Sequence, residues 1–408
     1  MTRKVFMSMM MLLAMSFAFV SCSNDDPVIV KNGTLTLEMP INVTDVVMNS
    51  FQGTATNVNS GTVVTLSAPV KNGDNFVVAI PDVEEGNYNI SAKGNISFVK
   101  DGVAGTTDFA VESNGVVVSE TSNAVKLSVN SFQAEGGFVI SEIFFTGTTT
   151  PEGSQYSGGD GYIIIANNSD VTLYADSIAV LESEFLTTDK QDYTPDIMSE
   201  AFSVEAVYMI PGTGKDVAVA PGEQLVLAIN AINHKEANPN SIDLTGADYE
   251  FYDVSSNPNF TDPDGAAANL DKWYCYTATV FSFHNRGFHS YAIAKMQKNK
   301  EQWLAENAYT ASYVFTFGEY SFDMTKDTYS IPNGWILDAV NLSVESVFEW
   351  IVTSPSLDSG WTYCGKVDRD TSRYGKAVVR KKDVNGKYVD TNNSTNDFEP
   401  EAQPTLLK

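Results

Sequence analysis

The feature that most constrains the fold of this chain is the alternation of apolar residues with polar or small ones. Segments 34–37, 61–66 and 76–80 alternate in this way, and Gly, Asn, Asp and Pro residues bound them. A period of two residues is typical of strands that bury one face in an antiparallel sheet. Helical periodicity is scarce along the chain, so the sequence predicts an all-β protein.

The spacing of these strands predicts two β-sandwich domains. Segment 81–91 indicates a turn followed by a strand, and segment 124–129 indicates a closing strand. Strands at about ten-residue spacing with polar turns are typical of a sandwich. The first sandwich is predicted to cover residues 31–133, and a larger second domain is predicted to cover residues 134–408.

One short helix is predicted within the second domain, over residues 294–307. Met296, Lys300, Trp303 and Leu304 form a thin apolar stripe at helical spacing in this segment. We expect this helix to lie on the surface and to pack against the second sandwich.

The N-terminus predicts where the protein is located. Two basic residues precede an apolar run, 5–20, which ends at Ser21-Cys22. These are the marks of a secretory signal, and the run is shorter than the roughly 20 residues of a membrane-spanning helix. A cysteine directly after a small residue indicates a lipoprotein box. We therefore expect the signal peptide, residues 1–21, to be removed and Cys22 to be lipidated.

Residues 22–30 are predicted to form an acidic tether. The segment 23–26, Ser-Asn-Asp-Asp, resembles the signal that directs Bacteroidota lipoproteins to the outer leaflet, although an ordinary solvated linker has a similar composition. Two or three acyl chains anchor a protein far more stably than one myristoyl chain. We expect a protein anchored by lipid to the outer membrane and exposed at the cell surface. The sequence alone leaves the choice between the periplasmic and extracellular faces open.

The charge of the chain excludes one class of partner. The 408 residues include 51 acidic and 25 basic side chains, which give a formal net charge of −26. Nucleic-acid binding needs clustered Lys and Arg residues, so no nucleic-acid partner is expected. The same excess of negative charge argues against flat adhesion to anionic lipid.

Two segments resemble known sandwich folds. Residues 83–90, Val-Glu-Glu-Gly-Asn-Tyr-Asn-Ile, resemble a strand entry of the transthyretin-like, carboxypeptidase-regulatory-like sandwich. Residues 162–174 resemble the lamin-tail type of immunoglobulin-like sandwich, with Ile164 at a position that usually holds Glu. These resemblances imply a spacer or docking module followed by an immunoglobulin-like domain, enlarged by loops and the short helix.

A family resemblance extends over most of the second domain. Segments 221–228, 284–288, 375–381 and 390–398 follow one another in an order that resembles Bacteroidota lipoproteins of the domain of unknown function 4876. The resemblance implies no established activity. Such lipoproteins often accompany nutrient importers of the outer membrane, so a TonB-dependent barrel importer and its lid lipoprotein are the partners that it implies.

The sequence contains no recognised catalytic motif. It has no G-x-S-x-G elbow, and segment 212–216 fails the phosphate-loop pattern. The three histidines, His234, His284 and His289, lack metal-ligand spacing and are expected to be structural. We predict no catalytic residue, no cofactor and no metal site. Paired carboxylates for glycoside hydrolysis remain an alternative, because their spacing is spatial and not sequential.

Loop 253–271 concentrates oxygen donors, which suit calcium. Asp262 and Asp264 are its weak calcium candidates, but the loop lacks the EF-hand order and an ordinary polar loop has the same composition.

Cys275 and Cys364 form either a disulfide, which the envelope permits, or two buried thiols. Closing a loop of about 90 residues contributes at most about 4.5 kcal/mol in the chain-entropy model.

Two groups of side chains are candidates for contact with a ligand or partner. All five tryptophans lie in the last third of the chain, and aromatic residues flank both cysteines. Exposed aromatics stack on sugars or anchor partners, whereas buried ones belong to the core. A basic stretch between residues 366 and 387 binds an acidic partner or neutralises the protein's own acidic surface. The candidates are Trp273, Tyr274, Trp361, Tyr363, Lys376, Arg380 and Lys381.

Ser177 lies in an Asp-Ser-Ile segment that matches the O-glycosylation pattern of Bacteroidota, although a turn at a strand edge has the same composition.

Together, these patterns predict a non-catalytic cell-surface lipoprotein that serves as an accessory or ligand-binding subunit of an importer of peptides or glycans. The alternatives are a surface adhesin or host-binding protein, and a cryptic hydrolase.

Overall fold

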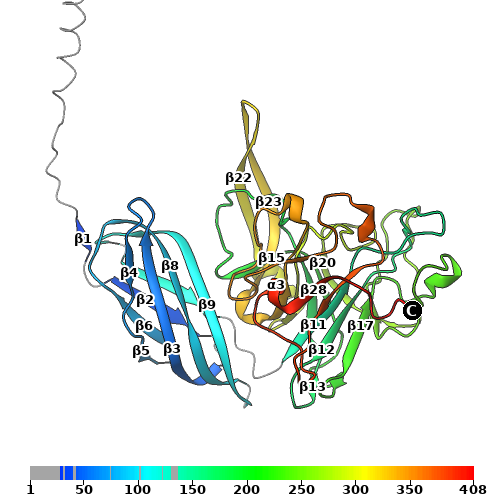
Figure 1. Cartoon of the computed structure of the whole chain (residues 1–408), viewed down its shortest axis with the longest axis horizontal. Helices are drawn as coiled ribbons and strands as arrows, with labels where there is room; N and C mark the ends of the chain where they lie inside the picture. Colours follow the sequence, from blue (N-terminus) through cyan, green and yellow to red (C-terminus); the bar gives the residue numbers. More distant parts are fainter. Residues whose placement is uncertain are drawn as a thin grey trace, which may run out of the picture.

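A computed structural model describes residues 28–408 apart from 31–32, 40–42, 74, 101–102, 122 and 130–136. The signal peptide, Cys22 and most of the predicted tether lie outside the described residues. Strands make up most of the ordered structure, so the predicted all-β class is confirmed (Figure 1). None of the helices in the described part of the chain could span a membrane.

The N-terminal sandwich consists of two four-stranded sheets. One sheet contains, in spatial order, β10 (Ala124–Ser128), β2 (Gly33–Glu38), β6 (Asn75–Ile80) and β5 (Val70–Asn72). The other contains β4 (Val63–Thr65), β3 (Val43–Asn57), β8 (Gly86–Lys100) and β9 (Val103–Val118). A two-stranded ribbon joins β1 (Ile29–Val30) to β7 (Val83–Glu84), so the last residues of the predicted tether already belong to the fold.

Alternation in the sequence decides which side chains enter this sandwich. In β2, Leu35 and Leu37 are fully buried, and Thr34 and Thr36, which precede them, are half-buried. Leu35 and Leu37 belong to one apolar cluster with Val78 and Ile80 of the neighbouring strand β6. The strands predicted around residues 34–37, 76–80 and 124–129 are therefore confirmed.

The C-terminal domain is built from two larger sheets. The first contains β19 (Ala268–Asn269), β18 (Tyr249–Glu250), β17 (Gln224–Ala228), β12 (Tyr162–Asn167), β11 (Phe138–Phe144), β27 (Ala377–Arg380) and β28 (Phe398–Ala402). The second contains β22 (Ala308–Phe317), β23 (Tyr320–Pro332), β15 (Ala201–Met209), β14 (Ile178–Ser183), β21 (Tyr291–Lys295) and β24 (Ile336–Val340), and β20 (Asp271–Cys275) pairs with β15. Two short ribbons join β13 (Leu173–Tyr174) to β16 (Ala218–Val219) and β25 (Leu342–Ser343) to β26 (Thr362–Tyr363).

Strands at the centre of these sheets are buried on both faces. In β12, Ile163 and Ile165 enter the main core, whereas Tyr162 and Ile164 enter a second cluster on the other face of the sheet. A strand that is covered on both faces reads as a continuous apolar run. The departure at Ile164 from the lamin-tail pattern therefore has a physical reason, because this side chain is 2% exposed.

The helix predicted over residues 294–307 is shorter than expected and begins later. Residues 294 and 295 belong to β21, and α2 covers Lys300–Glu306. Asn299 caps α2 through a hydrogen bond from the Gln302 backbone, and the Gln302 side chain returns to the Asn299 backbone. Trp303 is fully buried and fixes the helix to the domain. The remaining helices among the described residues are α3 (Ser394–Asp397) and 3-10 turns at His234–Glu236, Asn333–Trp335, Glu345–Val347 and Thr371–Arg373.

Candidate functional site

A cavity of about 410 Å³ lies in the C-terminal domain. Its wall includes three buried polar side chains from neighbouring strands: Glu182 of β14, Glu205 of β15 and His289, which precedes β21. One potential ligand atom from each of the three lies within 4.8 Å of the others. Within the described ranges, these three residues form the group of acidic and histidine side chains that could hold a metal ion.

A β-bulge brings the two carboxylates together. Glu182 pairs with Ala206, but the next pair is Ser183 with Val204, so Glu205 is the extra residue of β15. A bulge redirects the side chain of its extra residue, which is why bulges often border functional sites. Here it brings one carboxyl oxygen of Glu205 within 4.8 Å of one of Glu182 inside the domain.

The hydrogen bonds of His289 fix which ring nitrogen faces the carboxylates. Its Nδ1 atom lies 2.7 Å from the carbonyl oxygen of Ser183, which can only accept, so Nδ1 carries the proton. Nε2 lies 3.5 Å from Glu205 Oε1. In the neutral ring, an electron lone pair therefore faces a carboxylate oxygen. On the other side of the site, the Tyr291 hydroxyl donates to Glu182.

The environment shifts the ionisation of several groups around the cavity. Burial, and then the charge of Glu182, raise the pKa of Glu205 well above its ordinary value. Burial and the neighbouring Glu182 also raise the pKa of Tyr291 well above its usual range. Burial, followed by the charges of His289 and Arg286, lowers the pKa of His284 to about 4. All three shifts favour the neutral form of the side chain, so the surroundings of the cavity disfavour a charge that has no partner.

The sequence patterns do not reveal this cluster. Glu182 and Glu205 lie in different strands and become neighbours only through sheet pairing. One signal was present, because each interrupts an otherwise apolar strand, and a carboxylate in a fully buried strand needs a partner. The rings of His284 and His289 lie 5.6 Å apart beside the cavity. His234 is buried elsewhere, with Nε2 3.0 Å from the Asn230 carbonyl oxygen.

The predicted aromatic candidates belong mainly to packing clusters. Trp273 is 8% exposed and packs against Trp303, with ring centroids 6.1 Å apart. Tyr274 is half-buried against Tyr329, at 4.6 Å between centroids. Burial removes Trp273 from the candidates for ligand contact.

The other predicted aromatic pair is half-buried. Trp361 stacks on Phe348 at 4.6 Å, and its ring lies 5.7 Å from that of Tyr363. Both side chains keep part of their surface at the solvent boundary. Their proposed contact with a ligand or partner stays a prediction.

Arg380 cannot contact a partner, because its guanidinium is 1% exposed. It forms an ion pair with Asp338 at 2.5 Å and lies near Asp390 and Asp397. Lys376 pairs with Glu401 at 3.0 Å. These residues of the basic stretch neutralise the protein's own carboxylates, which corrects the prediction for Arg380.

Lys381 is exposed on this stretch, and its Nζ donates to the Asn396 carbonyl oxygen at 2.8 Å.

Neither Cys275 nor Cys364 is in a disulfide, so the structure favours the alternative of two thiols. Cys364 is fully buried, and burial raises the pKa of its thiol to about 12. A thiol with this pKa is unreactive at neutral pH.

The weak calcium candidates have different surroundings. Asp262 Oδ2 accepts a hydrogen bond from the Asp253 backbone at 2.7 Å, and Asp253 itself pairs with Lys272. Asp264 is exposed and accepts a hydrogen bond from the Asn269 side chain.

Ser177 is half-buried at a positive φ of 68°, in the turn between β13 and β14. Its glycosylation stays a prediction.

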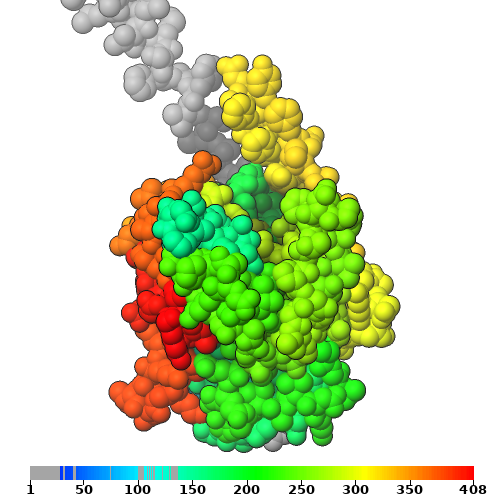
Figure 2. Space-filling model, turned by 90° about the vertical axis from the view of Figure 1, so that its right-hand side faces the viewer, coloured from blue at the N-terminus to red at the C-terminus, as the bar shows by residue number. Residues whose placement is uncertain are grey.

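A second candidate site is the hairpin β22–β23, which projects from the body of the domain (Figures 1 and 2). Cross-strand pairing places six large side chains on one face, because the pairs alternate along the ribbon. We call this set the aromatic face: Tyr313 opposite Met324, Phe315 opposite Phe322, and Phe317 opposite Tyr320. Phe317 and Tyr320, next to the turn, are 72% and 70% exposed.

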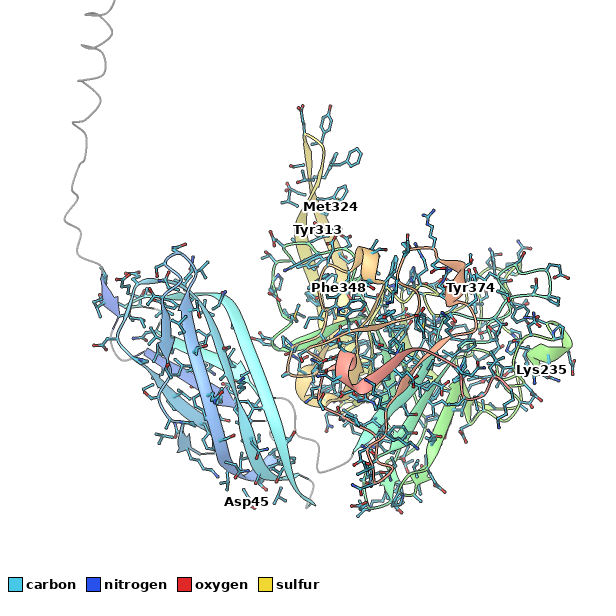
Figure 3. All side chains as sticks on the ribbon, viewed as in Figure 1. Asp45, Lys235, Tyr313, Met324, Phe348 and Tyr374 are labelled. Carbon is cyan, nitrogen blue, oxygen red and sulfur yellow. The ribbon has the colours of Figure 1, made fainter. Side chains whose placement is uncertain are left out.

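The aromatic face continues onto the body of the domain. Tyr313 lies at the base of the ribbon, as Figure 3 shows, with its ring 5.2 Å from that of Tyr193. Tyr193 stacks on Phe185 and on Trp350. Beside Tyr313 and Met324 the surface is hollowed by a pocket of about 700 Å³. The ribbon and this pocket form one continuous surface.

The outer edge of β22 also exposes hydrogen-bonding groups of the backbone. β22 is the last strand on its side of the sheet. Within the described ranges, a bridge between Thr194 and Ser312 covers the start of this edge. Residues 313–317 continue beyond that bridge. An open edge can accept an added strand from another chain.

Comparison with known proteins confirms the family resemblance. Residues 220–405 match the family described as protein of unknown function (DUF4876). A solved structure of a DUF4876 family protein from Bacteroides thetaiotaomicron VPI-5482 matches with a TM-score of 0.55 and 21% identity, covering 91% of this chain and 96% of that one. This likeness shows a shared fold.

A candidate cell adhesion protein from Parabacteroides distasonis ATCC 8503 matches with a TM-score of 0.16 and 9% identity, over 76% of this chain and 90% of that one. A likeness at this level supports no conclusion about fold or function. No curated protein matches the chain significantly.

Proposed function

We propose that this chain is a non-catalytic lipoprotein of the outer membrane that binds a second protein through the aromatic face of hairpin β22–β23. The lipoprotein box at Cys22 supports the location at the cell surface. The partner that the family resemblance favours is a TonB-dependent barrel importer with its lid lipoprotein. In this role the chain braces the importer or holds a peptide or glycan near it.

The observation that carries this proposal is the exposure of the aromatic face. Phe315, Phe317, Tyr320 and Phe322 are 41 to 72% exposed on a two-stranded ribbon. A two-stranded hairpin has little stability by itself, and soluble proteins rarely expose contiguous apolar patches of this kind unless they bind something. Aromatic side chains also supply much of the binding energy in protein interfaces.

The edge of β22 favours a protein over a lipid surface as the occupant. A strand from a partner can satisfy the backbone groups of residues 313–317 while its side chains meet the aromatic face. Hydrocarbon cannot satisfy such groups. Glu319 at the turn and Asp323 on the opposite face add negative charge to the ribbon, which opposes contact with anionic lipid.

The geometry of the cavity supports the absence of glycoside hydrolysis. Retaining glycosidases hold their carboxyl groups about 5–5.5 Å apart, and inverting ones about 6.5–9.5 Å apart. One carboxyl oxygen of Glu182 lies within 4.8 Å of one of Glu205, which is closer than either arrangement. A screen of glycosidase and peptidase substrates tests this part of the proposal. Turnover that is abolished by Glu205→Gln would overturn it.

The docking proposal is tested by isolating the chain from membranes in mild detergent. We expect a barrel protein and a lid protein to co-purify with the wild type and to be lost with Phe317→Ser. Ser321→Ala is the control, because Ser321 is exposed on the other face of the same ribbon and lies on β23, away from the open edge of β22. A monomer without companions, or equal recovery of partners with both variants, contradicts the proposal.

A further inference from the structure

The geometry of the cavity points to a metal site: we propose that Glu182, Glu205 and His289 bind Zn²⁺. This inference is independent of the hairpin and goes beyond the proposed docking function. It rests on the ligand types, on the orientation of the imidazole and on the burial of two acidic side chains that have no ion pair with Lys or Arg among the described residues.

The three side chains have the donor atoms that Zn²⁺ requires. One carboxylate oxygen from each glutamate and one imidazole nitrogen lie within 4.8 Å of one another. Donors at such separations surround a common point at about 2.0–2.2 Å after small side-chain adjustments, the usual length of bonds from Zn²⁺ to nitrogen and oxygen. All three residues are at least nine-tenths buried, at 3%, 9% and 8% exposure for Glu182, Glu205 and His289.

The orientation of His289 is that of a metal ligand. The Ser183 carbonyl oxygen holds the proton on Nδ1, so the lone pair of Nε2 points toward Glu205 Oε1. Two acceptors that face each other repel unless a proton or a cation lies between them. Histidine ligands commonly donate their second ring N–H to a backbone carbonyl, which fixes the tautomer in the same way. The hydroxyl of Tyr291 similarly orients Glu182.

A divalent cation also balances the charge of the cluster. Within the described residues, Glu205 lies 3.5 Å from the Nε2 atom of His289, and neither Glu182 nor Glu205 forms an ion pair with Lys or Arg. The nearby Lys326 is paired with Glu184 at 2.7 Å. Without a cation, both carboxyl groups can stay buried only if one of them is protonated, whereas Zn²⁺ allows both to ionise and makes the set neutral.

The ligand types select the metal. Ca²⁺ and Mg²⁺ take oxygen ligands almost entirely, whereas imidazole together with carboxylate suits Zn²⁺. Three protein ligands leave one tetrahedral position, and the cavity of about 410 Å³ lies beside the cluster. The fourth position is therefore available to water or to a small ligand with a metal-binding group.

The test is a calorimetric titration of the full chain, purified in mild detergent and stripped with a chelator. We expect one Zn²⁺ per chain with a Kd below about 1 µM, and no comparable binding of Ca²⁺. Glu205→Gln keeps the size of the side chain and its hydrogen-bonding capacity, and should weaken Zn²⁺ binding at least about 100-fold. Asp262→Asn, in the loop that the sequence favoured for calcium, is the control and should leave the Zn²⁺ affinity unchanged.

A second variant and a spectroscopic readout keep the proposal falsifiable if Glu205→Gln fails to fold. His289→Gln should lose Zn²⁺ in the same way. X-ray absorption of the Zn²⁺-loaded wild type should show one imidazole and carboxylate oxygens at about 2.0–2.2 Å. The proposal is overturned if the folded wild type binds no Zn²⁺, if both variants bind it as tightly as the wild type, or if the bound ion has no imidazole ligand.

Discussion

Replacing Arg380 by methionine should destabilise the C-terminal domain without any partner being involved. The guanidinium donates to Asp338, to the Ile140 carbonyl oxygen at 2.8 Å and to the Val389 carbonyl oxygen at 3.0 Å. It also lies 4.5 Å from the centre of the Phe398 ring. Asp338 links back to β11 by accepting the Ile140 N–H at 2.6 Å, so Arg380 and Asp338 join three strands.

The size of the expected loss of stability follows from the buried carboxylates that the substitution leaves without a cation. Asp338 and Asp397 have side chains that are 2% exposed, and both lose their cationic neighbour. Removing one partner of a buried ion pair typically costs about 3–5 kcal/mol. For a domain of this size, about 1 kcal/mol corresponds to a fall of about 2–4 °C in Tm. We therefore expect the Tm of the C-terminal domain to fall by roughly 10 °C.

Thermal unfolding followed by circular dichroism measures this change. Lys381→Met is the matched control, because it removes an exposed neighbouring charge and should shift Tm by no more than about 1 °C. If Arg380→Met leaves Tm close to that of the wild type, the buried network contributes little and the argument from burial fails.

Three further predictions concern other parts of the chain. Burial, with smaller effects of Asp253 and Glu250, raises the pKa of Asp262 from 3.8 to about 7, so wild-type stability should fall as pH rises through this range. Asp262→Asn should therefore be more stable than the wild type by about 1 kcal/mol at pH 8, after allowance for its partial exposure, but not at pH 4, in urea unfolding. Gly94→Ala should destabilise the N-terminal sandwich by about 1–3 kcal/mol, because the added Cβ would lie 2.1 Å from the Ser50 carbonyl oxygen, and an unchanged urea midpoint would contradict this. Reductant should leave Tm unchanged because Cys275 and Cys364 are free, whereas a reductant-dependent fall in Tm would show a disulfide.

Local patterns in the sequence predicted the strands of the N-terminal sandwich well, because strands such as β2 and β6 bury alternate side chains. The predicted start of the helix was wrong, and the reason also lies in the local sequence. Apolar spacing extended the prediction back to residue 294, but the pairing of β21 with β14 holds residues 294 and 295 in a strand. The capping box of Asn299 and Gln302 marks the true start, and both residues are readable in the sequence.

The candidate sites depend on contacts that sequence patterns do not reveal. Glu182 and Glu205 meet through a bulge between two strands, and His289 reaches them from a third segment. The hairpin had a local signal, since Phe317 and Tyr320 flank the two-residue turn Gly318-Glu319, with Gly318 at a φ of 61°. The exposure of its aromatic face was not readable, because alternating aromatic residues more often indicate a buried face.

The most direct test of the docking function is site-specific photocrosslinking in living cells. A photoreactive phenylalanine analogue replaces Phe315 on the aromatic face or Ser321 on the opposite face of the same ribbon, away from the open edge of β22. The proposed function predicts a crosslinked product with one outer-membrane protein from position 315 and little or none from position 321. Equal products from both positions, or the absence of any protein product at position 315, would contradict it.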